Sequence, residues 1–294
     1  MMKIQFWGTR GSIPSPGKST VKYGGNTSCV EVRVREHILI FDAGTGIRDL
    51  GNQLLNEFKL EPVTLHLFIS HTHWDHIQGF PFFMPAYNKN FQINVYGPPA
   101  RYKSLNELFK SQMESEYFPV PLGGLNAQIV MQEVRGPFRI GDLQITPFYL
   151  NHPAITFAYK IFDGKKTFVY ATDNEPYRYT HRAPRKNPLA AQYGAELDQK
   201  FIDFISEADF IVSEGQYTLE EYRSKIGWGH SPIESIVEFA IKANVKQLAL
   251  YHHDPAHDDA SIDALVKYTQ KLLATQKSSI HCFGAAEGME IQLA

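Results

Sequence analysis

Cysteine is nearly absent from this chain of 294 residues, because only Cys29 and Cys282 are present, far apart and without the spacing of metal ligands. A disulfide framework is therefore not expected, and the reducing cytoplasm is the predicted location. The chain also lacks any apolar run that approaches the length of a membrane span. Its first residues, 1–6, lead directly into a strand pattern, and we recognise no signal peptide ahead of them.

The chain also lacks a large excess of positive or negative charge. Lys and Arg number 29 against 31 Asp and Glu, which gives a net charge of −2. This balance does not indicate nucleic acid or an anionic membrane as a partner. The hydrophobic share of 43% and the charged share of 20% are those of a soluble globular protein. The length is sufficient to bury a substantial core in one large domain or two small ones.

Histidine, with twelve residues, is the unusual count, and its densest cluster is the stretch Ser70-His71-Thr72-His73-Trp74-Asp75-His76. The apolar run 65–69 just before it predicts a buried strand, so the cluster is expected on a loop at a strand end. Imidazole nitrogen and carboxylate oxygen are the ligands of Zn²⁺ and similar ions. His71 and His73 can bind one ion, and Asp75 and His76 a second beside it.

Strand and helix patterns cover most of the chain. Strands are predicted at 4–6, 29–34, 38–41, 65–69, 91–96, 127–134, 143–149, 156–162, 167–171, 210–213, 246–251 and 289–293, and helices at 47–58, 101–116, 197–208, 232–243 and 258–275. The apolar run 77–83 is either a helix that begins under the metal loop or a wall of the substrate pocket. The basic segment 174–193 is expected to be irregular and to act as a lid, a dimer contact or a mobile loop. A strand-rich half followed by alternating helices and strands fits a layered αββα sandwich, interpreted as one domain over 1–294.

Residues of metal-ligand type follow three further predicted strands. His152 follows strand 143–149, Asp173 follows strand 167–171, and the pair His252-His253 follows strand 246–251. A single Asp at a strand end is more often a cap or a turn residue. Four loops of this kind in one chain are difficult to explain by packing alone, so a metal site built from several loops is predicted.

In this combination the chain resembles the metallo-β-lactamase fold superfamily over nearly its whole length, in the motif order of that family. The resemblance implies an α+β fold, a four-layer αββα sandwich of the metallo-β-lactamase type. It also implies two divalent metal ions, with zinc as the first choice and manganese or iron as alternatives. One ion would be bound by His71, His73 and His152, the other by Asp75, His76 and His252, and Asp173 would bridge both. His253 is the alternative to His252.

The finer resemblance is to the phosphodiesterase branch, which includes the tRNA 3′-processing nuclease RNase Z and small-molecule cyclic phosphodiesterases. It is carried by Glu214 in Ser213-Glu214-Gly215-Gln216-Tyr217 and by His230 in Gly229-His230-Ser231. In that family the His is the proton donor and the Glu orients it, a sound general-acid pair on chemical grounds. The alternative for His230 is a structural residue before a helix that starts near Pro232. Asp75 is expected to accept a proton from the attacking water.

The segments 8–12 and 23–28 also look like openings of this branch, and Arg10 or Asn26 is a candidate phosphate contact. The resemblance therefore implies a dinuclear-metal hydrolase that cleaves a phosphodiester bond. A small or cyclic nucleotide is the first expected substrate, because RNase Z carries a Gly-rich basic arm for tRNA, whereas the strongest basic segment here, 177–186, is short. Nucleic acid is a less favoured partner, and no membrane partner is expected. The protein is expected to form a homodimer.

Four alternatives are kept. The first is an RNase Z-like tRNA 3′-processing endonuclease, and the second is a thioester or lactone hydrolase of the same fold. An iron-dependent oxidoreductase with the same ligand set and a non-catalytic binding protein belong to other classes. The intact ligand set argues against the binding protein, and the pair formed by Glu214 and His230 favours phosphoryl chemistry over thioester or lactone hydrolysis.

Overall fold

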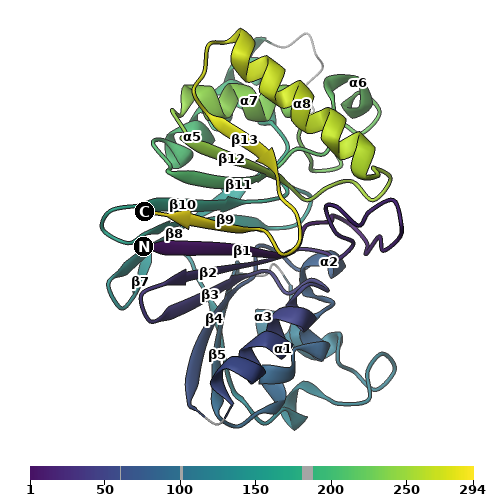
Figure 1. Ribbon diagram of the computed structural model, residues 1–294, viewed down its shortest axis with the longest axis vertical. Helices are drawn as coiled ribbons and strands as arrows, with labels where there is room; N and C mark the ends of the chain where they lie inside the picture. Colours follow the sequence, from purple (N-terminus) through teal and green to yellow (C-terminus); the bar gives the residue numbers. More distant parts are fainter. Residues whose placement is uncertain (60, 100–101, 181–187) are drawn as a thin grey trace. The chain divides into compact units, whose positions relative to one another are not determined.

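The computed structural model describes residues 1–59, 61–99, 102–180 and 188–294. The described chain forms two compact units. The first contains Met1–Gly136 together with Ala286–Ala294, and the second contains Pro137–Ala285. Figure 1 shows a β-sheet and its helices in each unit.

The first unit is a mixed seven-stranded sheet in the order β14-β1-β2-β3-β4-β5-β6. Its strands are β1 (Met2–Gly8), β2 (Cys29–Val34), β3 (His37–Phe41), β4 (Val63–Phe68), β5 (Phe91–Gly97), β6 (Gln128–Glu133) and β14 (Glu290–Leu293). Strands β3 to β6 run parallel, whereas β1 pairs antiparallel with β2 and β14. The C-terminal strand thus completes a sheet that the N-terminal residues begin.

Helices α1 (Ile47–Phe58) and α3 (Leu105–Ser111) pack on the first sheet. Helix α1 buries one apolar stripe, and its residues Ile47, Leu50 and Leu54 share a core with strand residues such as Leu65 and Leu67. The spacing of three and four residues along α1 is that of one helix face, which explains why the sequence forms a helix here. The unit also contains the short helix α2 (Trp74–Ile77) and the 3₁₀ turns η1 (Phe80–Phe82), η2 (Met84–Tyr87) and η3 (Leu122–Gly124).

The second unit is another mixed seven-stranded sheet, in the order β13-β12-β11-β10-β9-β8-β7. Its strands are β7 (Phe138–Ile140), β8 (Leu143–Leu150), β9 (Thr156–Phe162), β10 (Thr167–Ala171), β11 (Phe210–Glu214), β12 (Gln247–Tyr251) and β13 (His281–Gly284). Its helices are α4 (Tyr177–Thr180), α5 (Pro188–Ile205), α6 (Leu219–Tyr222), α7 (Ile233–Lys242) and α8 (Asp259–Thr275). Side chains of α5, α7 and α8 share one core with the sheet.

The predicted helix 101–116 is wrong in extent. Helix α3 covers only Leu105–Ser111, because Ser104 and Glu107 form a reciprocal capping box that fixes its start. Arg101 lies outside the described residues. The expectation of an irregular segment 174–193 is also wrong in part, since α4 and the beginning of α5 lie within it. The basic residues Arg182, Arg185 and Lys186 lie outside the described residues.

The apolar run 77–83 is not one regular helix, and its role as a wall of the substrate pocket stays a prediction. It contains the end of α2 and the turn η1, and Phe80 and Phe83 belong to the core of the first unit, whereas Phe82 is exposed. The sequence patterns missed the short strands β7 and β13 and the one-turn helices α4 and α6. Elements this short provide too few residues for a periodic pattern.

Two mixed seven-stranded sheets with flanking helices confirm the predicted fold class. None of the helices that the structure describes is long and apolar enough to cross a membrane. The prediction of one domain over 1–294 stays a prediction.

Candidate metal-binding site

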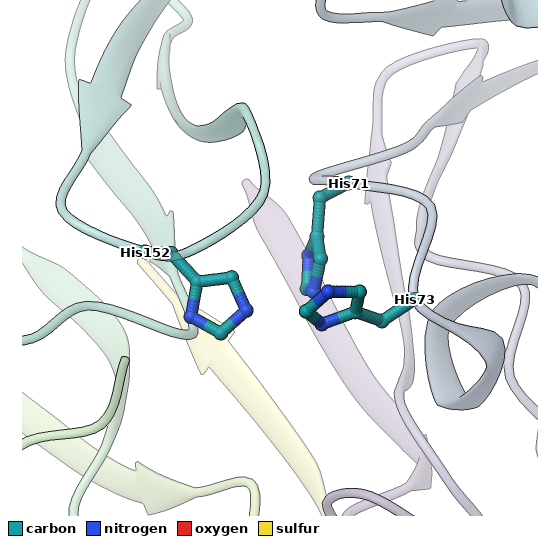
Figure 2. A group of neighbouring side chains, drawn as sticks. All are labelled: His71, His73 and His152. Atoms are coloured by element: carbon teal, nitrogen blue, oxygen red, sulfur yellow. The ribbon is translucent and has the colours of Figure 1, made fainter. Parts of the chain in front are cut away.

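The histidine-rich loop of the first unit begins where β4 ends, at the carboxyl edge of the parallel strands. Figure 2 shows His71 and His73 projecting from this loop. The centroid of the His71 ring lies 4.5 Å from that of His73 and 4.2 Å from that of His76. His71 and His76 are buried and His73 is exposed. Three imidazoles thus lie close together on one loop, and a neutral imidazole nitrogen is a common metal ligand.

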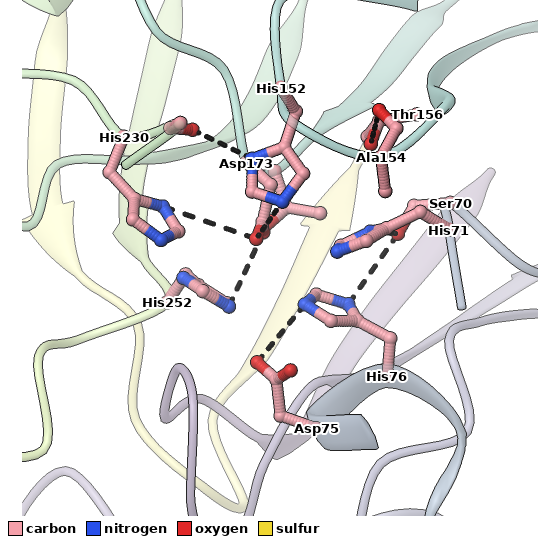
Figure 3. Close-up of polar contacts among 12 residues, drawn as sticks. Ser70, His71, Asp75, His76, His152, Ala154, Thr156, Asp173, His230 and His252 are labelled. Carbon is pink, nitrogen blue, oxygen red and sulfur yellow. Dashed lines mark hydrogen bonds and ion pairs between the residues drawn. The ribbon is translucent and has the colours of Figure 1, made fainter. Parts of the chain in front are cut away.

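Asp42, at the end of β3, supports this loop and was not among the predicted site residues. Its carboxylate accepts hydrogen bonds from the backbone N–H and the hydroxyl of Ser70 at 2.7 and 2.8 Å. It lies 2.8 Å from Nδ1 of His76. A carboxylate on Nδ1 fixes the proton there and turns the lone pair of Nε2 outward, the usual support for a metal-binding imidazole. Nε2 of His76 faces Asp75 Oδ2 at 3.2 Å (Figure 3).

The loop 8–12 supports Asp75 through its backbone. The backbone N–H of Ser12 donates to Asp75 Oδ2 at 2.7 Å. Arg10 is fully buried and its Nε donates to the carbonyl of Gly24 at 2.7 Å. Asn26 donates from its side chain to the carboxylate of Glu287 at 3.1 Å. Arg10 and Asn26 thus have partners within the fold, and a contact of either with phosphate stays a prediction.

The predicted ligands of the second unit lie at one edge of its sheet. Strands β10 and β12 are both parallel to β11, and β8 points the same way as β10 because each pairs antiparallel with β9. His152, Asp173 and His252 follow the carboxyl ends of β8, β10 and β12. The topology therefore gathers side chains that are far apart in the sequence. His152 is also the third residue drawn in Figure 2.

Asp173 is the centre of this cluster (Figure 3). Its Oδ1 lies 3.3 Å from Nε2 of His252, and its Oδ2 lies 3.8 Å from Nε2 of His152. Nδ1 of His152 lies 3.0 Å from the carbonyl of Gly229, which can only accept, so this nitrogen carries the proton and Nε2 keeps its lone pair. Asp173 therefore presents one carboxylate oxygen to each of these two imidazoles.

His252, not His253, lies beside Asp173. The Nε2–H of His253 donates to the carbonyl of Ala285 at 2.9 Å, which ties that ring to the backbone. Nδ1 of His252 lies 2.7 Å from the side-chain nitrogen of Gln216, whose Oε1 is buried without a hydrogen-bond partner. A 180° turn of this amide would satisfy both groups, because Oε1 would accept Nδ1–H and Nε2 of His252 would carry the lone pair.

Three residues of the clusters, one in the first unit and two in the second, have a left-handed backbone. The φ angles are +61° at Asp42, +49° at Asp173 and +55° at His252. This conformation is uncommon for residues other than glycine, and such positions cluster at functional sites, where the surrounding structure stabilises them. Asp42 and His252 follow the last residue of β3 and β12, and one residue separates Asp173 from the end of β10. The backbone turns at each of these positions, and this turn sets the direction of the side chain.

Glu214 and His230 form a pair beside Asp173. Oε2 of Glu214 lies 2.7 Å from Nδ1 of His230, and Oε1 accepts the backbone N–H of Asn174 at 2.5 Å. Burial raises the pKa of Glu214 above its ordinary value, and the neighbouring His230 opposes that rise. Helix α7 begins after Pro232. The contact of the His230 ring with Glu214 fits the predicted pair, and the role of His230 stays a prediction.

Glu175 anchors the loop that carries His230, and no sequence motif marks it. Its buried carboxylate accepts the backbone N–H of Gly227 at 2.7 Å and of Gly229 at 2.8 Å, and it also accepts the hydroxyl of Tyr222. Gly229 has φ +92°, and a Cβ there would lie 2.1 Å from Nδ1 of His152. Only glycine permits this close approach.

Replacing Glu175 with Gln should lower the free energy of unfolding by about 1–3 kcal/mol, because an amide NH₂ would face a donor and leave a buried N–H without an acceptor. Urea unfolding followed by circular dichroism measures this change. The control is Glu196→Gln on the exposed face of α5, which should stay within about 0.5 kcal/mol of the parent protein. Equal stability of the two variants would contradict the anchoring role.

Cys29 is not expected to take part in chemistry. It is fully buried in β2, and burial together with Glu31 and Asp42 raises the pKa of its thiol well above the ordinary value. A nucleophilic cysteine needs the opposite shift. Cys29→Ser should therefore leave turnover almost unchanged, measured as kcat after checking that folding and metal content are intact. A large loss of kcat in such a protein would refute this.

The donor set suits divalent transition metals. Each unit presents imidazole nitrogens and carboxylate oxygens in a buried cluster, which is the mixed ligand chemistry of zinc, manganese or iron. In the second unit, ligand atoms of His152, Asp173 and His230 lie within 4.8 Å of one another, as do those of Glu214, His230 and His252. These clusters are consistent with a dinuclear metal site.

Comparison with known proteins identifies the family. The model of the β-lactamase superfamily domain matches residues 37–253. Ribonuclease Z of Thermococcus kodakarensis is 25% identical over 284 residues, covering 86% of this chain and 84% of that protein. Ribonuclease Z of Picrophilus torridus is 23% identical over 289 residues, covering 88% of each.

Solved structures share the fold over the whole chain. YhfI of Bacillus subtilis, a metallo-β-lactamase fold protein, superposes with a TM-score of 0.69 at 20% identity, covering 99% of this chain and 98% of that one. Yeast PDE1 gives a TM-score of 0.71 at 14% identity and covers 99% of both chains. With the family match over most of its length and full-length relatives among the ribonucleases Z, this chain belongs to the metallo-β-lactamase superfamily, in the branch that contains RNase Z, PhnP and PDE1-like proteins.

Proposed function

We propose that the protein is a metal-dependent phosphodiesterase that binds two divalent ions. The proposed ligands are His71, His73, Asp75, His76, His152, Asp173 and His252. The observation that carries the proposal is the buried pair formed by Glu214 and His230 next to Asp173, because a carboxylate-held imidazole is a general acid for an alkoxide leaving group. Membership of the branch that contains RNase Z supports the same reaction.

In the proposed reaction, each of the site residues has a separate role. When bound, two divalent ions supply Lewis acidity, which activates a water molecule and neutralises charge on the phosphate oxygens. Asp173 presents one carboxylate oxygen to Nε2 of His152 and the other to Nε2 of His252, so that these groups would hold an ion together, and Asp75 would accept a proton from the attacking water. His230 carries its Nδ1 proton toward Glu214 and delivers a proton from Nε2 to the leaving oxygen.

The substrate class follows less directly from the residues. The full-length relatives named above are ribonucleases Z, and they favour RNA, as in tRNA 3′ processing, over the small or cyclic nucleotide expected first. A small nucleotide remains a second candidate because the net charge of −2 provides little general attraction for a polyanion. Homodimer formation stays a prediction.

A substrate panel tests the proposed function. Purified, metal-replete protein would be assayed with bis(p-nitrophenyl) phosphate, cyclic nucleotides, dinucleotides, a tRNA precursor with a 3′ trailer, a lactone and a thioester. We expect cleavage of phosphodiesters that stops on addition of a chelator and returns with zinc or manganese. Hydrolysis of the lactone or thioester without any phosphodiester cleavage would overturn the proposal.

Elemental analysis of the same protein tests the metal content. Two ions per chain are expected, because the ligands separate into two sets that share Asp173. One ion or fewer in metal-replete protein would contradict the dinuclear site. Iron as the bound metal, combined with oxygen consumption and no hydrolysis, would instead support the oxidoreductase alternative.

A further inference from the structure

Trp228 is a large aromatic residue with 56% of its surface exposed to solvent. It lies only two residues before His230 in the sequence. It lies between Gly227 and Gly229, whose φ angles are +90° and +92°. Both glycine N–H groups donate to the buried carboxylate of Glu175, so the backbone on either side of the indole is fixed. An exposed aromatic ring on an anchored backbone is a preformed surface for a flat ligand.

The indole belongs to a small cluster that reaches His230. The ammonium of Lys225 lies 4.4 Å from the centroid of the Trp228 ring and 5.1 Å from that of Tyr217. The Tyr217 ring in turn lies edge-on to the His230 ring, with centroids 6.3 Å apart. Cation–π contacts of this kind hold a side chain in one orientation and place a positive charge beside the ring. Through Tyr217, the cluster therefore connects the exposed indole and the Lys225 ammonium with His230, the proposed proton donor.

We propose that Trp228 stacks on the base of the nucleoside that leaves, and that Lys225 contacts the adjoining phosphate. This inference rests on the proposed function and deepens it. His230 protonates the leaving oxygen, so the group that carries this oxygen, not the retained phosphate, comes closest to the loop of His230. For a nucleotide substrate that group is a nucleoside, and its base is the flat partner that an indole accepts with little sequence preference.

Stacking makes a specific kinetic prediction. Trp228→Ala should lower kcat/KM about ten- to hundredfold for a dinucleotide, the range expected when one stacked base is lost. For the same dinucleotide with an abasic sugar on the leaving side, the loss should stay within about threefold, because no base is present to stack. Trp228→Phe should retain most activity on both substrates. The control is Tyr102→Ala, which removes an exposed aromatic residue of the first unit and should change neither value.

Equal losses of kcat/KM on the base-bearing and abasic substrates would overturn the stacking role, because they would indicate a structural effect. An unchanged kcat/KM for Trp228→Ala on the dinucleotide would overturn it as well. If instead no phosphodiester is cleaved by the parent protein, the proposed function fails, and a binding measurement still tests the aromatic face.

That measurement is tryptophan fluorescence during titration with adenosine 5′-monophosphate. The chain has only three Trp residues, so quenching by a stacked base can be assigned by substitution. Quenching is expected in the parent protein and should be lost in Trp228→Phe, in which Trp7 and Trp74 still report on the protein. Quenching of equal size in both proteins, or none in either, would overturn the inference.

Discussion

His73→Ala is expected to abolish phosphodiester cleavage, with a loss of kcat to the level of the assay blank. His73 is the exposed imidazole of the loop after β4, and its removal takes one ligand from a proposed metal position without opening a cavity in the core. The ion at that position is needed to activate the water. The measurement pairs kcat on bis(p-nitrophenyl) phosphate with elemental analysis, and fewer ions per chain should accompany the loss of activity.

The matched control is His281→Ala. His281 is also an exposed histidine, at the start of β13, but its ring packs against Phe283 and has no proposed metal role. Activity and metal content of this variant should equal those of the parent protein. If His73→Ala keeps both its two ions and its activity, the assignment of His73 as a ligand is wrong. If it keeps its ions and loses activity, His73 acts on the substrate instead.

The sequence predicted the loops of the candidate site better than the contacts within them. His71 to His76 are contiguous and follow a strongly apolar strand, so both the loop and its chemistry can be recognised from local pattern. His152, Asp173 and His252 each follow a strand, and parallel topology brings strand ends to one edge. The histidine-rich loop can therefore be predicted from the local sequence pattern, and the gathering of the other ligands at one edge follows from the topology of the sheet.

The supporting residues could not be predicted because they depend on contacts between distant segments. In the sequence, Asp42 belongs to a Gly-rich turn after a strand, which indicates no contact with a distant residue. Only the pairing of β3 with β4 brings it to Ser70 and His76. Glu175 has no motif at all, and three donors from residues 222–229 reveal its role. The choice between His252 and His253 depended on backbone direction at φ +55°, which adjacent identical residues do not encode.

The pairing of β14 with β1 shows the same limit at the level of the fold. The sequence predicts a strand at 289–293 but not its pairing with the strand at the N-terminus. Nothing in residues 290–293 alone specifies which sheet they complete. The register with Met2 to Gln5 is set by the whole first unit, including the hydrogen bond between Gly288 and Phe6 that guides the strand into place.

His230→Ala should keep its metal content and lower kcat by roughly a hundredfold to ten-thousandfold, the usual range for a lost proton donor. The expectation depends on the leaving group. An alkoxide such as a ribose oxygen needs a proton when it departs, whereas p-nitrophenolate does not. The loss should therefore be large for a dinucleotide and small for bis(p-nitrophenyl) phosphate. Measuring kcat on both substrates, with metal analysis of the variant, tests the general-acid role.

Glu214→Gln should show the same dependence on the leaving group, but more weakly, because Glu214 acts only through the orientation of the imidazole. Its Oε2 faces Nδ1 of His230 at 2.7 Å, and a Gln amide can still present an oxygen there. A structural role for His230 predicts a different pattern, in which His230→Ala loses thermal stability and the leaving group makes no difference to the loss of kcat. Equal losses of kcat on the two substrates would therefore count against proton donation. A loss confined to the alkoxide substrate in both variants would identify His230 as the acid and Glu214 as the residue that positions it.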